Sequence, residues 1–101
     1  MHATVRRYEG VDASRTAELS RKIDETLMPR LSELPGFDSY YVIEAGNGVM
    51  TSVGLFETSA QADESTRLAS GWVQEEKLET LLPNPPKITS GEVIAHKNNG
   101  V

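Results

Sequence analysis

No cysteine occurs among the 101 residues of this chain. Disulfide bonds, thiolate nucleophiles and cysteine-ligated metal sites are therefore excluded, although a chain without cysteine fits any redox compartment. The chain also lacks any run that approaches the roughly 18 apolar residues of a membrane span. Residues 1–9 lack the apolar core of a signal peptide, so we expect a cytoplasmic location.

Positive charge is sparse as well. The 10 Lys and Arg residues are outnumbered by 15 Asp and Glu residues, which gives a formal net charge of −5. Because there is no basic stripe, we expect neither nucleic acid nor an acidic membrane surface as a partner. Apolar residues make up 38% of the chain and recur periodically, which predicts a single folded domain over residues 1–101. Residues 98–101 are expected to form a loose tail.

The first third of the chain predicts a strand followed by a helix. Residues 3–9 carry β-branched and aromatic side chains and end at Gly10, as in a strand closed by a turn. Apolar side chains recur at helical spacing over residues 12–34, and this segment begins with an aspartate that suits a helix N-cap. Pro29 removes a helical hydrogen bond, so we expect a kink or short break near Met28.

A hairpin and a second helix are predicted next. The strand-like runs 37–45 and 49–57 are separated by Gly-Asn-Gly at 46–48, and Asn-Gly between such runs is a strong hairpin signal. Thr58 and Gln61 form a capping-box pattern, which predicts the start of a helix. The inner stripe of this helix consists of small and apolar residues: Ala62, Ser65, Ala69, Trp72 and Val73.

The C-terminal quarter predicts a last strand. A short helical extension is expected through Leu78, Leu81 and Leu82, and it ends at the proline-rich residues 83–86. Residues 88–97 follow as the final strand. Strand, helix, hairpin, helix and strand form the βαββαβ order of a ferredoxin-like α+β fold, with one antiparallel sheet and both helices on one face.

Both faces of the predicted sheet are apolar. On the second strand, one face carries Phe37, Tyr41 and Ile43, and the other carries Tyr40 and Val42. The third strand repeats this pattern, with two apolar residues opposite three others: Met50 and Phe56, against Val49, Val53 and Leu55. Two helices cover only one face, so we predict that the open face pairs with a second copy to form a homodimer, a dimeric α/β barrel.

Element order, chain length and short motifs carry a family resemblance. The motifs are the Pro-Gly-Phe step at 35–37 into the second strand, the Phe-Glu at 56–57 that ends the third strand, and the helix that follows. As a pattern over residues 3–97, the chain resembles the antibiotic biosynthesis monooxygenase-like family of small dimeric α/β barrels. The resemblance implies a cofactor-free oxygenase of phenolic or quinol substrates, or a haem-degrading enzyme, in a family that also has members without known activity.

Two departures from the family pattern bear on cofactors. Many members carry a histidine early in the second helix, where this chain has Asp-Glu-Ser at 63–65. The haem-degrading branch joins an asparagine on the first strand to a tryptophan and a haem-ligating histidine on the second helix. Only Trp72 corresponds to these residues here, so we expect neither haem nor another cofactor.

Aromatic residues are the first candidates for a substrate site. Trp72 lies on the helix face that meets the sheet, and Tyr41 and Phe56 come from the two hairpin strands. We therefore predict a cleft in which Trp72 and Phe56 bind the substrate and Tyr41 transfers a proton. The alternative interpretation is that Trp72, Tyr40 and Tyr41 serve core packing and the subunit interface.

Arg6 and Arg7 point to opposite faces of a central strand, so at least one of them is partly buried and needs a partner. Arg7 is our choice for the helix side, because it shares strand parity with Ala3 and Val5. It is the second predicted catalytic residue, as the group that stabilises an anion or enolate. The alternative is a structural ion pair with a carboxylate: Glu92, Glu44 or Glu57.

The two histidines offer one conceivable metal site. His2 and His96 lie at the start of the first strand and the end of the last, which are neighbours in this fold, and Glu9 or Asp38 could complete a ligand set. The histidines lack the spacing of ligands on a helix, so no metal is expected.

Two hypotheses on function remain open. In the first, a dimeric barrel binds a small aromatic, phenolic or quinol-like molecule between helices and sheet and catalyses its cofactor-free oxygenation. Arg7 would stabilise the anion, Tyr41 or a water would handle the proton, and Trp72 would hold the ring. In the second, the protein is a non-enzymatic homodimer that binds a small ligand or has a structural role.

Overall fold

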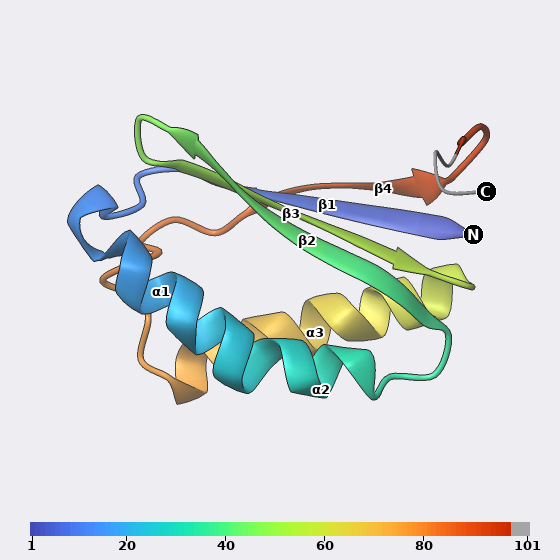
Figure 1. Cartoon of the computed structure of the whole chain (residues 1–101), viewed down its shortest axis with the longest axis horizontal. Coiled ribbons are helices and arrows are strands. Elements are labelled where there is room, and N and C mark those ends of the chain that lie inside the picture. Colours follow the sequence, from blue (N-terminus) through green and yellow to red (C-terminus); the bar gives the residue numbers. More distant parts are fainter. Residues whose placement is uncertain (98–101) are drawn as a thin grey trace.

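Figure 1 shows the computed structural model of the chain, which describes residues 1–97. Its elements in chain order are β1 (His2–Tyr8), η1 (Ala13–Arg15), α1 (Thr16–Lys22), η2 (Ile23–Leu27), α2 (Met28–Ser32), β2 (Phe37–Gly46), β3 (Val49–Phe56), α3 (Ser59–Glu75) and β4 (Lys87–Glu92). The elements from η1 to α2 run on without a gap, and we call them the first helical segment.

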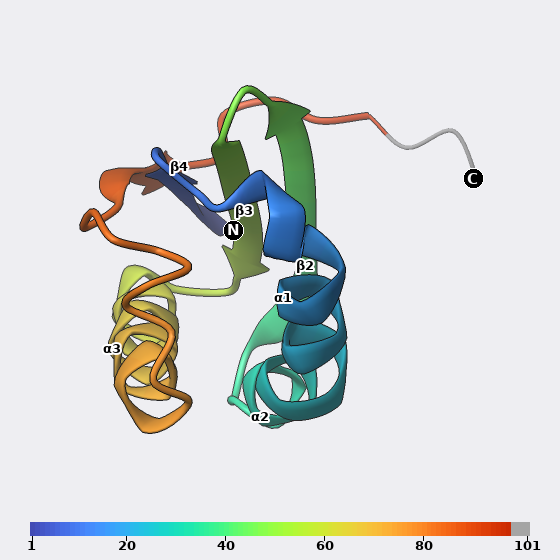
Figure 2. The ribbon, with the colours of Figure 1, turned by 90° about the vertical axis from the view of Figure 1, so that its left-hand side faces the viewer.

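The sheet has the order β2-β3-β1-β4, and all neighbouring strands are antiparallel. Figure 1 shows the first helical segment and α3 below the sheet, and α2 and α3 also lie below the strands in Figure 2, so both helical parts cover the same face. This arrangement confirms the predicted ferredoxin-like α+β fold. Within residues 1–97, no helix is long and apolar enough to cross a membrane.

The first helical segment passes through Pro29 without breaking. Asp12 caps its first turn by accepting a hydrogen bond from the Ser14 amide at 3.1 Å, as the sequence predicted. Directly ahead of Pro29, the helix widens into the π-helical turn η2. Proline has no amide hydrogen and its ring crowds the preceding turn, so the interruption expected near Met28 takes the form of this wider turn.

The hairpin forms as predicted. β2 and β3 pair along their length, and the connecting residues 46–48 have positive φ angles of 86°, 54° and 74°. Glycine and asparagine adopt this conformation at the lowest cost, which is why the chain turns here. A register shift between Phe37 and Ser39 places Phe37 against the core, so the strand alternation that grouped it with Tyr41 is wrong at this position.

The second helix, α3, begins as predicted and ends early. Thr58 and Gln61 bond reciprocally at 3.3 Å and 3.1 Å, which completes the capping box. The helix stops because Lys77 adopts a φ of 56° and the Leu78 amide donates to the Val73 carbonyl at 2.9 Å. This turn contradicts the predicted helical extension, and three leucines are buried in a loop instead: Leu78, Leu81 and Leu82.

The last strand is shorter than predicted. The sequence indicated a strand over 88–97, but β4 ends at Glu92. Its partner β1 begins at His2, which pairs with Glu92, and one further backbone hydrogen bond, from the Val93 amide to the Met1 carbonyl at 2.9 Å, closes the ladder. The loose tail predicted over 98–101 lies outside the described residues.

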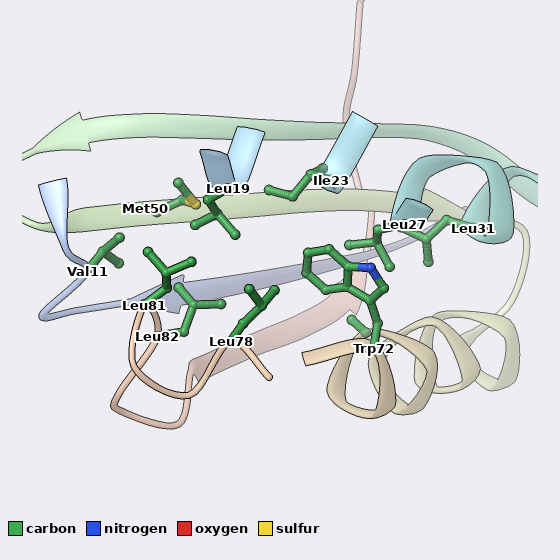
Figure 3. Packing of buried hydrophobic residues seen from close by; sticks show 11 residues of the cluster. Val11, Leu19, Ile23, Leu27, Leu31, Met50, Trp72, Leu78, Leu81 and Leu82 are labelled. Carbon is green, nitrogen blue, oxygen red and sulfur yellow. The ribbon is translucent and has the colours of Figure 1, made fainter. Parts of the chain in front are cut away.

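The core lies between the sheet and the helices. Its main cluster draws side chains from the loop after β1, the first helical segment, β3, α3 and the loop after α3 (Figure 3). The cluster consists of Val11, Leu19, Ile23, Leu27, Leu31, Met50, Ala69, Trp72, Leu78, Leu81 and Leu82. Burial of apolar surface contributes about 25 cal/mol per Å², so this cluster is a major source of stability.

No helix among residues 1–97 covers the opposite face of the sheet. The apolar residues that point there, which we call the outer face, are Ala3, Val5, Tyr41, Ile43, Val49, Val53 and Leu55. Tyr41 and Ile43 expose 58% and 48% of their surface. The predicted apolar character of both faces is therefore confirmed at these positions.

Candidate functional site

Strand alternation on β1 decides which arginine faces the helices. Arg6 lies on the helix side and exposes only 1% of its surface. Arg7 is exposed on the opposite side, where its Nε lies 3.1 Å from a carboxylate oxygen of Glu9. The orientation predicted for Arg7 is wrong, because the alanine and valine that share its parity belong to the outer face.

Arg6 is a buried cation without a carboxylate partner among residues 1–97. Its Nη2 donates to the Tyr40 hydroxyl at 2.9 Å, its Nη1 donates to the Thr66 hydroxyl at 3.2 Å, and its Nε makes no hydrogen bond. The guanidinium carbon also lies 5.8 Å from the centroid of the Tyr40 ring. Neutral partners only partly offset the cost of burying a charge. The structural ion pair weighed from the sequence does not form with any of its candidates: Glu92, Glu44 or Glu57.

A cleft of about 500 Å³ opens beside Arg6, between α3, β1, β4 and residues 83–86. We call it the Arg6 cleft. Its walls are largely apolar and include Val73, Pro85 and Ile88. A volume of several hundred Å³ with apolar walls and few polar groups is typical of small-molecule sites.

Tyr8 lines the same cleft and has a raised pKa. Burial raises the pKa of the Tyr8 phenol because a phenolate would lose its solvation, and the nearby positive charge of Arg6 offsets part of this increase. Tyr8 therefore keeps its proton at neutral pH. It can donate a hydrogen bond to a ligand but does not act as a base.

Stability at high pH tests this environment of Tyr8. Its pKa in the folded chain lies above the ordinary value of 10.0, so the unfolded chain loses this proton first as the pH rises. The stabilisation is fully present below about pH 10 and is lost as the pH rises through the folded pKa. We expect the free energy of unfolding, measured with urea, to fall more steeply above that pH for the wild type than for Tyr8→Phe. Equal slopes would contradict a buried Tyr8.

Trp72 lines a separate and much smaller cavity. This inner cavity measures about 20 Å³, which is room for about one water molecule. Trp72 is 2% exposed, its indole Nε1 donates to the Thr26 hydroxyl at 2.6 Å, and its ring points toward the first helical segment (Figure 3). Ser52 also faces this cavity with a buried hydroxyl that makes no hydrogen bond within the described chain. The residues that line both spaces, and so separate them, are Tyr8, Val73 and Leu82.

The four site residues predicted from the sequence do not come together within one chain. Arg7 and Tyr41 lie on the outside of the sheet, and Trp72 lies on its helix side. Phe56 is fully buried on the helix side but packs edge-on against Phe37, with ring centroids 5.8 Å apart. Phe56 lines neither the inner cavity nor the Arg6 cleft. The predicted cleft that joins these residues is therefore wrong for the single chain.

The sequence interpretation named Arg6 only as one of two choices and missed Tyr8 and Thr66. A signal for Tyr8 was present, because residues two apart on a strand face the same side and Tyr8 follows Arg6 in this way. No feature of the sequence indicated that Thr66 contacts Arg6. Which polar residue of α3 meets β1 depends on how the helix crosses the sheet, and local spacing does not determine that crossing.

The histidines do not gather a metal site within residues 1–97. The His2 Nε2 lies 2.9 Å from the Ser90 hydroxyl oxygen, and His96 follows the end of β4. Glu9, one of the expected companions, pairs with Arg7 and Lys87. No group of three or more His, Asp and Glu side chains in this part of the chain is placed to hold a metal ion.

No protein-family model matches the sequence, and no curated protein matches it. Solved structures match its fold over nearly the whole chain. A monooxygenase from the gene ActVA-Orf6 of Streptomyces coelicolor, solved with the ligand nanaomycin D, is 19% identical, with a TM-score of 0.72 over 98% of this chain and 92% of that chain. A candidate antibiotic biosynthesis monooxygenase of Deinococcus radiodurans is 20% identical, with a TM-score of 0.70 over 97% of each chain.

A third match concerns assembly. A dimeric ferredoxin-like protein from an uncultured marine organism is 13% identical, with a TM-score of 0.71 over 98% of this chain and 92% of that chain. At such low identities these likenesses establish the fold and no more. The predicted resemblance is confirmed at that level: the chain has the fold of the antibiotic biosynthesis monooxygenase-like proteins. Because one fold hosts many activities, function has to be argued from the site.

Proposed function

We propose that this protein is a cofactor-free monooxygenase that acts on a small aromatic, phenolic or quinol-like substrate. The observation that carries the proposal is the Arg6 cleft, which joins about 500 Å³ of largely apolar space to a buried arginine without a carboxylate partner in the described chain. A monooxygenase among the proteins of the same fold supports this choice of reaction.

In the proposed reaction the protein stabilises an anion electrostatically and excludes water from the cleft. The electron-rich carbon of an ionised phenol or enol gives electrons to dioxygen and bonds to it, which forms a peroxide. The peroxide takes up a proton and eliminates water, so that a CH₂ group becomes a carbonyl. One oxygen atom enters the product, and the other leaves as water. Arg6 stabilises the anion in place of Arg7, and Tyr8 takes the donor role foreseen for Tyr41.

Dioxygen uptake tests the proposal. With anthrone or naphthohydroquinone, at a pH high enough to ionise part of the compound, we expect protein-dependent uptake that persists after dialysis against a chelator and needs no added flavin or metal. Labelled dioxygen is expected to leave one labelled atom in the product. Arg6→Gln is expected to lower kcat/KM by about 10²-fold, as for the loss of one group that stabilises an oxyanion. The control is Arg67→Gln, because Arg67 is an exposed arginine of α3 paired with Glu64. This variant is expected to keep the kcat/KM of the wild type.

The second candidate function is binding of the same class of molecule without turnover. The observation that favours it is the lack of a base, since Glu79 is the only carboxylate among the residues that line the cleft and it is exposed. Binding of these compounds with no dioxygen uptake above the buffer rate would contradict the monooxygenase and support this candidate.

We also propose that the protein is a homodimer that closes a barrel through its outer face. The support is the apolar character of that face, the exposure of Tyr41 and Ile43, and the lack of a helix over it among residues 1–97. A second copy is a suitable cover because a two-fold axis brings the same apolar patch of both subunits together. The dimeric protein of the same fold is consistent with this assembly.

A further inference from the structure

The charge of the Arg6 cleft is unbalanced without a ligand. Arg6 is 1% exposed, and its hydrogen-bond partners in the described chain are two neutral hydroxyls, those of Tyr40 and Thr66. Its Nε has no partner. Buried arginines are usually paired with carboxylates or phosphates, because hydrogen bonds to anions are about twice as strong as those to neutral groups. An anionic oxygen beside Arg6 would therefore compensate the buried positive charge and accept a hydrogen bond from the guanidinium.

None of the elements around Arg6 supplies that anion or a base. β1 contributes Tyr8 to the cleft, β2 contributes the Tyr40 hydroxyl that bonds Arg6, and the polar groups that α3 contributes to the cleft are hydroxyls and an amide. The loop after α3 contributes the exposed Glu79, which forms no ion pair with Arg6. His2 lies on β1 but is hydrogen-bonded to Ser90 at the far end of the strand. A substrate that had to lose a proton inside the cleft would find no acceptor beside Arg6.

We propose that the Arg6 cleft binds its substrate as a preformed anion, a phenolate or enolate whose oxygen pairs with the Arg6 guanidinium and accepts a hydrogen bond from Tyr8. This inference rests on the proposed function and narrows the substrate class. The substrate is an acidic phenol or a conjugated enol that is already substantially ionised near neutral pH, so that its own acidity replaces a base of the protein.

Thr66 is the group that the ligand oxygen displaces. Its hydroxyl accepts from Arg6 at 3.2 Å, which is longer than the 2.9 Å contact with Tyr40, and it lines the cleft. The same hydroxyl also approaches the Ala62 carbonyl at 3.4 Å, so Thr66 keeps a partner when it releases Arg6. An entering oxygen thus replaces an acceptor that has a second hydrogen-bond partner of its own.

The pKa of bound para-nitrophenol tests the anion site directly. This probe changes its absorbance when it ionises, so a pH titration reports its pKa in the free and bound states. A cation within about 4–6 Å lowers the pKa of an acid by about 1–3 units. We expect a decrease of at least about 1 unit, which means that the anion binds at least about tenfold more tightly than the neutral phenol. Para-nitroanisole, which has a similar shape and no acidic proton, is expected to bind as weakly as the neutral form.

Matched variants assign the effect to Arg6. Arg6→Gln is expected to abolish the decrease in probe pKa, whereas Arg6→Lys and the exposed control Arg67→Gln are expected to keep it. Thr66→Ala is expected to tighten phenolate binding several-fold, because it removes the competing acceptor. If Arg6→Gln does not fold, the anion site is still tested by the two probes bound to the wild type and by the affinity of Thr66→Ala for the phenolate. A bound probe with an unchanged or raised pKa, or a decrease that survives in Arg6→Gln, would overturn the proposal.

The binding assay separates this inference from the proposed function, because no dioxygen is involved. A lowered probe pKa together with no dioxygen uptake would contradict the monooxygenase and leave the anion site intact. Dioxygen uptake together with an unshifted probe pKa would overturn the anion site and leave the monooxygenase intact.

Discussion

Val53→Asp is expected to dissociate the homodimer. Val53 lies at the centre of the outer face, where it pairs with Val5 of β1 and with Tyr41 of β2. A carboxylate placed there without a partner would be buried by the second copy, at a cost of about 3–5 kcal/mol for each charge. Each charge therefore raises the dissociation constant by at least about 10²-fold. Sedimentation equilibrium over a range of concentrations measures this change.

Two controls separate loss of the dimer from loss of the fold. Ser20→Asp adds the same charge at an exposed position of α1 and is expected to leave the dimer intact. Val53→Ala removes the side chain without adding a charge and is expected to weaken the dimer much less. Circular dichroism of Val53→Asp is expected to retain the signal of the folded subunit. A wild type that sediments as a monomer, or a Val53→Asp variant that remains dimeric, would contradict the outer face as the interface.

Trp72→Ala is expected to lower the free energy of unfolding by about 3–5 kcal/mol, the range measured when large aromatic residues are removed from a core. The side chain is 2% exposed and its indole hydrogen bond ends at Thr26 in the first helical segment. Its removal therefore leaves a cavity where α3 meets that segment. The loss is a large part of the roughly 5–15 kcal/mol that stabilises a typical domain. Urea denaturation measures it.

Milder variants test whether Trp72 is core or ligand contact. Thr26→Val removes the acceptor of the indole hydrogen bond and the bond that the Thr26 hydroxyl donates to the Lys22 carbonyl at 2.7 Å, and it is expected to cost about 1–2 kcal/mol. Trp72→Phe keeps most of the ring and is expected to leave the affinity for para-nitrophenol within about twofold of the wild type, because Trp72 does not line the Arg6 cleft. A Trp72→Phe variant with near-normal stability and a large loss of probe affinity would restore the ligand role predicted from the sequence.

The parts of the fold that depend on neighbouring residues were predictable from the sequence. The hairpin followed from Asn-Gly at 47–48, and the start of α3 followed from Thr58 and Gln61, because turn and cap conformations are set within a few residues. The ends of elements were less predictable. The last strand ends where its pairing with β1 ends, at His2 and Glu92, and α3 ends at Glu75, two residues before the left-handed Lys77, which carries no sequence signal for that conformation.

The candidate site was predicted less well because it depends on which face of β1 turns inward. A strand exchanges its two faces when its register shifts by one residue, and Val5 and Tyr8 gave both faces of β1 apolar character. The sequence therefore could not choose between Arg6 and Arg7. Trp72 was correctly placed on the face that meets the sheet, but its distance from the arginine depends on the loop after α3. That loop brings Leu82 between the inner cavity and the Arg6 cleft.

The most direct test is a crystal structure of the protein with para-nitrophenol, grown at a pH at which the probe is ionised. The predicted result is a phenolate oxygen within about 3 Å of an Arg6 guanidinium nitrogen, with the ring between α3 and Pro85 in the Arg6 cleft. Probe bound on the outer face or in another cavity, with Arg6 still bonded to Thr66, would contradict the claim that this cleft is the functional site.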